Sequence, residues 1–343
     1  MRTITLGSTG ITAPQNGFGA LPIQRVSFET AGRLLRRAYE GGMRFFDTAR
    51  AYSDSEEKIG NSISDIRDDI FIASKTQAKT PEKFWEDLAA SLRLLKTDHI
   101  DIYQFHCVDR CYRPGDGTGM YECMEQAKAE GKIRHIGITT HRLMVAEEII
   151  ESGLYETLQY PFSYLSSEKE RALPGKCREK NMGFIAMKGL AGGLLTNANA
   201  CMSFMLQYDN VMPIWGIQRD KELEEWLAFM DHEPVMTEET EAFIAQERKQ
   251  LDGEFCRGCG YCMPCPAGIE INNCARMSLM LRRAPSSAWL TPVWQEKMKK
   301  IEGCLHCNRC MSKCPYELNT PDLLAKNYED YKRVLAGEVS VTE

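Results

Sequence analysis

Hydrophobic residues follow two alternating patterns between about residues 15 and 230. Short runs rich in β-branched and aromatic residues, typical of buried strands, alternate with longer amphipathic segments typical of helices. The runs that predict strands are 16–21, 43–47, 70–75, 100–106, 133–140, 157–162, 183–188 and 211–216. The segments that predict helices are 27–40, 55–64, 81–95, 119–130, 142–152, 167–180, 199–208 and 219–230.

This alternation predicts an α/β fold, a (β/α)₈ barrel of the TIM type. The alternative is an open, doubly wound sheet, which is disfavoured because no Gly-x-Gly-x-x-Gly follows the first predicted strand. Residues 3–14 predict a β-hairpin that closes the bottom of the barrel.

The pattern changes after residue 232, where the strand signals stop. Helices are expected at 238–250, 269–284, 291–302 and 320–336, the last with Thr320 as its N-cap. We therefore expect two domains, a barrel over 1–232 and an α-helical region over 233–343 that combines a linker helix with a ferredoxin-like domain.

Charge and composition narrow the possible functions. The net charge of −6 gives no reason to expect a nucleic-acid partner, and neither a signal peptide nor a membrane span is expected. We expect a cytoplasmic protein, in which concentrated cysteines indicate metal or redox chemistry. Nine of the 14 cysteines lie after residue 255.

Eight of these cysteines form two runs, each ending in Cys-Pro. The second run has the spacing C-x₂-C-x₂-C-x₃-C-P of bacterial iron–sulfur proteins, and the first is one residue shorter before its last cysteine. Zinc is the main alternative, but structural zinc usually takes two separate C-x₂-C pairs, and a disulfide framework is a weaker one. We expect two [4Fe–4S] clusters in a module that resembles the α-helical ferredoxin domains fused to many redox enzymes.

In two-cluster ferredoxins the fourth cysteine of each run binds the other cluster, and a crossed ligand can tolerate the shortened spacing. Cys274 fits neither run and is expected to pack in a helix. The expected ligands are Cys256, Cys259, Cys262 and Cys314 for one cluster, and Cys304, Cys307, Cys310 and Cys265 for the other.

Four polar residues are expected at the rim of the barrel where its strands end, which is where barrel enzymes perform chemistry. They are Asp47, Tyr52, Lys75 and His106. A tyrosine can donate a proton to a carbonyl oxygen while hydride reaches the carbon, if a nearby ammonium lowers its pKa. A carboxylate would hold the lysine, and a histidine would orient the carbonyl. Each residue taken alone also has a purely structural explanation.

The segments "GGMRFFDTARAYSDSEEKIG", "FIASK", "IYQFH", "GKIRHIGITTH" and "MKGLAGGLL" resemble the aldo-keto reductase family. The whole chain resembles the branch of that family with a C-terminal ferredoxin-type extension. The resemblance implies that the four rim residues are a catalytic tetrad with the tyrosine as acid–base. It also implies NAD(H) or NADP(H) as cofactor, with contacts from Gly19, Ala20, Thr139, Thr140, Gln159, Met187 and Lys188.

The resemblance also exposes a departure from the family pattern. The stretch "IWGIQRDKELEEW" aligns with the loop that usually grips the 2′-phosphate of NADP(H), and it carries Gly216, Ile217 and Glu222 in place of the usual lysine, serine and arginine. Arg219 is nearby and could replace them. A strong preference for NADPH is therefore not expected.

We predict an oxidoreductase that interconverts carbonyl and alcohol groups, with clusters that relay electrons to or from a ferredoxin or flavodoxin. Six basic and three acidic residues in 269–303 suggest an acidic carrier. Hydride moves two electrons whereas each cluster moves one, so alternatives remain: a nicotinamide-independent reductase fed single electrons, an electron-transfer or redox-sensing module with a non-catalytic barrel, or clusters that only stabilise the fold. The substrate, the reaction direction and the oligomeric state are not predicted.

Overall fold

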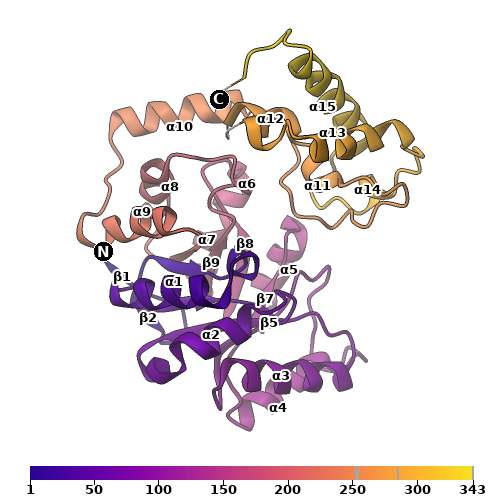
Figure 1. Ribbon diagram of the computed structural model, residues 1–343. Helices are drawn as coiled ribbons and strands as arrows, with labels where there is room; N and C mark the ends of the chain where they lie inside the picture. Colours follow the sequence, from indigo (N-terminus) through magenta and orange to yellow (C-terminus); the bar gives the residue numbers. More distant parts are fainter. Residues whose placement is uncertain (252–254, 284–285, 342–343) are drawn as a thin grey trace. The chain divides into compact units, whose positions relative to one another are not determined.

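The computed structural model describes residues 1–251, 255–283 and 286–341 (Figure 1). Its contacts group the chain into two compact units. The first is Met1–Gly189 with Ala198–Glu241, and the second is Leu190–Asn197 with Ala242–Glu343. The grouping differs from a division at residue 232 in two segments, 233–241 and 190–197. The second of these is the loop that leaves the seventh strand of the barrel.

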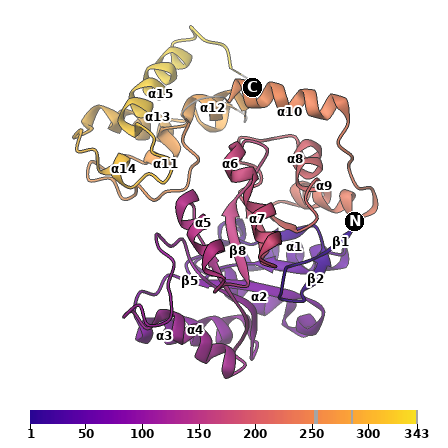
Figure 2. The same cartoon turned by 180° about the vertical axis from the view of Figure 1, so that it is seen from behind.

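The first unit is a closed barrel of eight parallel strands, as the hydrophobic pattern predicts. Each strand pairs with the next in sequence, and the last pairs with the first, for example Trp215 with Phe18. Helices surround the strands in both views (Figure 1, Figure 2). The strands are β3 (Gly17–Gly19), β4 (Phe45–Asp47), β5 (Phe71–Thr76), β6 (Ile100–Phe105), β7 (Ile133–Thr139), β8 (Thr157–Pro161), β9 (Gly183–Met187) and β10 (Val211–Gly216).

Helices follow the strands at the expected positions. Ser27 and Thr80 cap their helices, each accepting a backbone N–H bond, from Thr30 and Lys83 respectively. The helix expected at 167–180 is interrupted at Ala172 and forms two shorter helices. The helices are α1 (Phe28–Glu40), α2 (Ser55–Ile63), α3 (Pro81–Leu95), α4 (Met120–Ala129), α5 (Leu143–Ser152), α6 (Glu168–Arg171), α7 (Leu173–Glu179), α8 (Ala198–Met205) and α9 (Asp220–Asp231), with 3₁₀ turns η1 (Pro22–Arg25) and η2 (Ser64–Asp69).

The predicted N-terminal hairpin closes one end of the barrel. Strands β1 (Thr3–Thr5) and β2 (Thr12–Pro14) pair antiparallel. Their apolar side chains join a single buried cluster with side chains from the barrel strands, among them Phe45, Ile102 and Met212. Since this end is packed, a ligand site in the barrel has to lie at the other end, where the strands end.

The second unit is helical. Its helices are α10 (Glu238–Gln250), α11 (Ile271–Cys274), α12 (Met277–Arg283), α13 (Pro292–Lys299), α14 (Arg309–Ser312) and α15 (Thr320–Leu335), with 3₁₀ turns η3 (Ser286–Ala288) and η4 (Lys300–Gly303). The prediction of Thr320 as N-cap of α15 is wrong. The N-cap is Asn319, whose side chain accepts the N–H of Asp322, and Thr320 is the first helical residue. None of the helices in the described residues is long and apolar enough to cross a membrane.

Candidate functional site

A buried ion pair lies where β4 and β5 end. Asp47 is the last residue of β4 and Lys75 the penultimate residue of β5, so the parallel register brings their side chains to one end of the barrel. Nζ of Lys75 lies 2.7 Å from both carboxylate oxygens of Asp47 and 2.6 Å from the carbonyl oxygen of Thr48. Both charged side chains are almost completely buried. The carboxylate therefore fixes the position of the ammonium, as expected from the sequence.

Tyr52 and His106 lie beside this pair. Tyr52 is in the loop between β4 and α2, and His106 directly follows β6. Their rings meet edge to face with centroids 5.6 Å apart, and Nζ of Lys75 lies 5.3 Å from the centre of the Tyr52 ring. The structure thus brings together all four rim residues that the sequence singled out.

The protonation of Tyr52 differs from the sequence-based expectation. Burial, then the negative charge of Asp47 and then Cys107, raise the pKa of Tyr52 well above its usual value. The expected lowering by Lys75 is not found, because the ammonium is paired with Asp47 and the carboxylate opposes it. The phenol is therefore protonated at neutral pH and able to donate a proton.

His106 is neutral at physiological pH. Burial, and to a smaller extent the positive charge of Lys75, lower the pKa of His106 to about 3. Its Nδ1 atom is buried and has no hydrogen-bond partner among the described residues. A neutral imidazole with a buried polar atom suits a group that binds a carbonyl oxygen.

Two glutamines extend the hydrogen-bond network of the Asp47–Lys75 ion pair. Nε2 of Gln159, at the third position of β8, lies 3.5 Å from a carboxylate oxygen of Asp47, and its Oε1 accepts a 2.8 Å bond from Gln104. Gln159 is one of the residues expected from the resemblance, but Gln104 was missed. The signal was present, because Gln104 and His106 are two positions apart in an extended segment and face the same side.

The expected nicotinamide contacts on β7 are hydrogen-bonded to the loop after β6. Oγ1 of Thr139 accepts the N–H of Cys107 at 2.7 Å, and Oγ1 of Thr140 donates to the carbonyl of Val108 at 2.9 Å. Sγ of Cys107 lies 3.9 Å from Nδ1 of His141. Cys107 and His141 were not in the predicted site, although both directly follow residues expected to be functional.

The remaining expected contacts also lie at strand ends. Gly19 ends β3, and the N–H of Ala20 donates to the carbonyl of Asp47 at 2.8 Å. Met187 ends β9, and Lys188 follows it with a left-handed backbone, φ 58°. A side chain at Gly19 would place its Cβ 3.0 Å from the carbonyl oxygen of Trp215, so glycine allows β3 and β10 to approach closely where these strands end.

The loop expected to meet the adenosine end of the cofactor is occupied by an ion pair. Oε2 of Glu222 accepts the backbone N–H groups of Gln218 and Arg219 at 3.0 Å each, at the start of α9. Its Oε1 accepts a 2.9 Å bond from Nε of Arg219. The backbone donors and the cation that could bind a phosphate here are thus already engaged by a carboxylate.

The cysteines of the two runs gather around two cavities in the second unit. The first cavity is lined by three cysteines of the first run and by the last cysteine of the second run. Cys256 is 8% exposed, whereas the other three are partly exposed. We call this cavity the inner cavity; its cysteines are Cys256, Cys259, Cys262 and Cys314.

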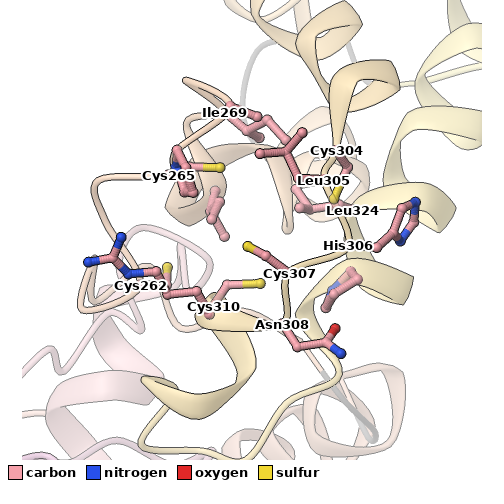
Figure 3. Close-up of a pocket in the computed structure, with 15 residues that line it drawn as sticks. Cys262, Cys265, Ile269, Cys304, Leu305, His306, Cys307, Asn308, Cys310 and Leu324 are labelled. Atoms are coloured by element: carbon pink, nitrogen blue, oxygen red, sulfur yellow. The ribbon is translucent and has the colours of Figure 1, made fainter.

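The second cavity, here called the outer cavity, is lined by three cysteines of the second run and by two cysteines of the first run. Figure 3 shows the sulfur atoms of Cys265, Cys307 and Cys310 facing the same space. Cys262 also lines it and separates the two cavities. Cys307 is exposed, as are the neighbouring residues from Leu305 to Arg309. The four cysteines expected to act together here are Cys265, Cys304, Cys307 and Cys310.

Burial makes the thiols of the inner cavity harder to ionise. Burial raises the pKa of the Cys262 thiol to about 12, with Cys256 and Cys259 adding to the effect. Burial also raises the pKa of Cys256. Bound iron would offset this effect, because a metal cation stabilises the thiolate. Within the described residues, no three His, Cys, Asp or Glu side chains are close enough to hold a single metal ion.

Fold and site together define a barrel oxidoreductase joined to an iron–sulfur module. Residues 4–200, more than half of the chain, match the profile of the Aldo/keto reductase family. Residues 255–319 match that of a 4Fe-4S dicluster domain. The chain belongs to the aldo/keto reductase family and carries a C-terminal 4Fe–4S dicluster domain.

Known proteins resemble the barrel part. The chain is 29% identical over 216 residues to the uncharacterized oxidoreductase YqkF of Bacillus subtilis, covering 57% of this chain and 67% of the relative. It is 26% identical over 232 residues to the NADH-specific methylglyoxal reductase of Escherichia coli, covering 57% and 69%. An aldo-keto reductase from Klebsiella pneumoniae in complex with NADPH has the same fold, with a TM-score of 0.60 at 22% identity, covering 72% of this chain and 96% of that one. The chain thus matches about two thirds of the length of these two curated relatives.

Proposed function

We propose that this protein interconverts carbonyl and alcohol groups at the barrel mouth and holds two [4Fe–4S] clusters that relay electrons. The observation that carries the first part is the arrangement of Lys75, Asp47, Tyr52 and His106 around one site. The observation that carries the second is the gathering of eight cysteines around two cavities within a 4Fe–4S dicluster domain. On its cysteine chemistry we expect it to be cytoplasmic.

The side chains divide the work of carbonyl reduction. Bound nicotinamide would supply the hydride, that is, a proton together with two electrons, to the carbonyl carbon. Tyr52 would donate its phenolic proton to the oxygen, so that the alcohol forms and the phenolate remains. Lys75 would stabilise that phenolate once the negative charge develops, because Asp47 holds its ammonium next to the ring. Neutral His106 would bind the carbonyl oxygen.

Several residues fit a nicotinamide at this site. The buried Nδ1 of His106 has no hydrogen-bond partner among the described residues, which supports a polar ligand at this end of the barrel. Gln159, Thr139 and Thr140 would hold the amide, with Gly19, Ala20, Met187 and Lys188 near the ring and ribose. The side chains of Gln159, Thr139 and Thr140 are buried and hydrogen-bonded, which would limit the ordering cost of binding.

The experiment that tests the proposal is cofactor binding to anaerobically purified holo-protein, with the cluster absorbance recorded at the same time. We expect NADH to bind and the absorbance to bleach when the carbonyl site is empty. Bleaching by a one-electron donor without any nicotinamide binding would instead favour a nicotinamide-independent reductase. Cofactor turnover with unchanged clusters would favour clusters that only stabilise the fold, and neither response would favour a non-catalytic barrel.

Cofactor preference is expected to be weak or in favour of NADH. Glu222 occupies the backbone donors and Arg219, and its charge would repel a 2′-phosphate. If the protein prefers NADPH at all, its dissociation constant for NADPH should be less than about a hundredfold lower than that for NADH. A hundredfold ratio corresponds to about 2.7 kcal/mol of binding free energy. Glu222→Gln keeps the acceptor and removes the charge, so it should tighten NADPH more than NADH. A larger preference for NADPH in the unmodified protein would contradict this assignment.

The electron partner that we propose is a ferredoxin or flavodoxin that docks near the outer cavity. Residues 269–303 carry a net positive charge, but much of this charge is buried or paired. Arg276 is buried. Three further cations of this segment form ion pairs: Arg282 with Asp330, Arg283 with Glu247, and Lys297 with Glu270. The exposed cations closest in sequence to Cys307 are Lys299, Lys300 and Arg309.

Reduction by such an acidic carrier should therefore slow as salt increases. Raising the ionic strength from about 0.1 M to about 1 M shortens the Debye length from ~10 Å to ~3 Å and screens the attraction. The double variant Lys299→Gln, Lys300→Gln should lose much of the salt dependence in stopped-flow measurements, whereas Lys221→Gln on α9 should not. A rate independent of salt would show that charge does not guide this encounter.

A further inference from the structure

Arg276 is a buried cation with no acidic partner among the described residues. It lies between α11 and α12 and is 8% exposed. Its Nη1 donates to the carbonyl of Gly192 at 3.0 Å, and Nη2 lies 3.5 Å from Oδ1 of Asn273. No described carboxylate is within ion-pair distance, in contrast to Arg282 and Arg283 of α12. Since an uncompensated buried charge is costly, its position needs an explanation.

The guanidinium packs against the first cysteine run. Gly258 stands between Cys256 and Cys259 with a left-handed backbone, φ 68°, and a Cβ there would lie 2.7 Å from Nη1 of Arg276. Gly192, also left-handed, would place a Cβ 2.6 Å from the same atom. The two glycines thus allow the guanidinium to approach the backbone of the inner cavity closely.

We propose that Arg276 is a positioning residue that holds a positive charge against the cluster of the inner cavity and raises its reduction potential. The inference rests on the proposed ligation of a cluster by Cys256, Cys259, Cys262 and Cys314. Adding one electron makes the cluster and its thiolates more negative by one charge. A nearby buried cation stabilises that reduced form more than the oxidised form, because the interior screens charges weakly.

Two features of the surroundings keep the charge in place. The carbonyl of Gly192 accepts from Arg276, and Leu194 in the same loop accepts a 3.0 Å bond from Arg283. Burial lowers the pKa of Arg276, and negative charge on Cys256 and Cys259 opposes this effect. A cluster bound by these cysteines would supply the counter-charge that this buried arginine otherwise lacks among the described residues.

The test is a redox titration of the holo-protein followed by electron paramagnetic resonance, with dithionite as the one-electron donor and ferricyanide as the oxidant. A Cys256→Ala variant identifies the signal of the inner cluster. Arg276→Gln should lower the potential of that cluster by about 59 mV, a tenfold change in the ratio of reduced to oxidised cluster for one electron. The other cluster should shift less, and Arg282→Gln, which removes an arginine paired with Asp330, should shift neither.

A second variant covers the case in which Arg276→Gln loses iron. Asn273→Asp keeps the arginine and gives it a carboxylate partner in place of the amide oxygen, so it should lower the same potential. An unchanged inner potential in both variants, or in Asn273→Asp alone when the other variant loses its cluster, would overturn the inference. Absence of iron–sulfur clusters from the unmodified protein would overturn the proposed function instead.

Discussion

Replacement of Tyr52 by phenylalanine should abolish carbonyl reduction while both clusters remain. The substitution removes only the phenolic hydroxyl, and the ring can still pack edge to face against His106. Loss of a positioned general acid costs about 10²–10⁴-fold in rate. We expect a decrease in kcat of at least about a hundredfold, with an unchanged dissociation constant for the nicotinamide.

The matched control is Tyr39→Phe on α1. Its hydroxyl donates to Asp69 at 3.0 Å in an exposed hydrogen bond that includes no rim residue, and its loss should leave kcat unchanged. Iron content and cluster absorbance should be the same in both variants and the unmodified protein. Turnover of the Tyr52→Phe variant at the rate of the unmodified protein would show that another group supplies the proton.

Two pairs of cysteine substitutions should have opposite effects if the runs exchange their last ligands. Cys256→Ala with Cys314→Ala removes two ligands from the inner cavity and leaves the outer four intact. This variant should keep one intact cluster, about four iron atoms per chain. Cys307→Ala with Cys314→Ala removes one ligand from each cavity and should keep no intact four-iron cluster.

The measurement is iron content combined with electron paramagnetic resonance of the reduced protein. Ligation of each cluster by its own run would reverse the outcome for the two variants, so the comparison decides between the arrangements. Cys274→Ser is the matched control, because Cys274 is buried in the same unit and lines neither cavity. It should retain both clusters.

The strand positions were predictable because buried parallel strands are short, continuous apolar runs. All eight lie where the pattern placed them, and three of the rim residues follow from reading the polar residues at or next to the end of each strand. Asp47, Lys75 and His106 were found this way. Gln104 was missed because a glutamine within an apolar run was taken as part of the strand rather than as an inward-facing side chain beside His106.

Properties that depend on the environment of a group could not be predicted from its position in the chain. The pKa of Tyr52 is raised because burial, the charge of Asp47 and Cys107 all disfavour the phenolate, and these effects depend on distances in the folded chain. Residues 269–303 expose less positive charge than their composition suggests, because Arg282 and Arg283 are paired with Asp330 and Glu247 on other helices. The interrupted helix at Ala172 and the cap at Asn319 differ from the predictions only locally.

The assignment of residues 190–197 to the second unit has a consequence for protein engineering. The loop leaves β9 of the barrel, yet its carbonyl groups at Gly192 and Leu194 are bound by Arg276 and Arg283 of the helical region. A truncated protein that ends at residue 241 would keep a barrel loop whose hydrogen-bond donors have been cut away. The two regions are consecutive in the chain but cannot be exchanged like modules, and chimaeras with other barrels would have to carry this loop together with the cysteine runs.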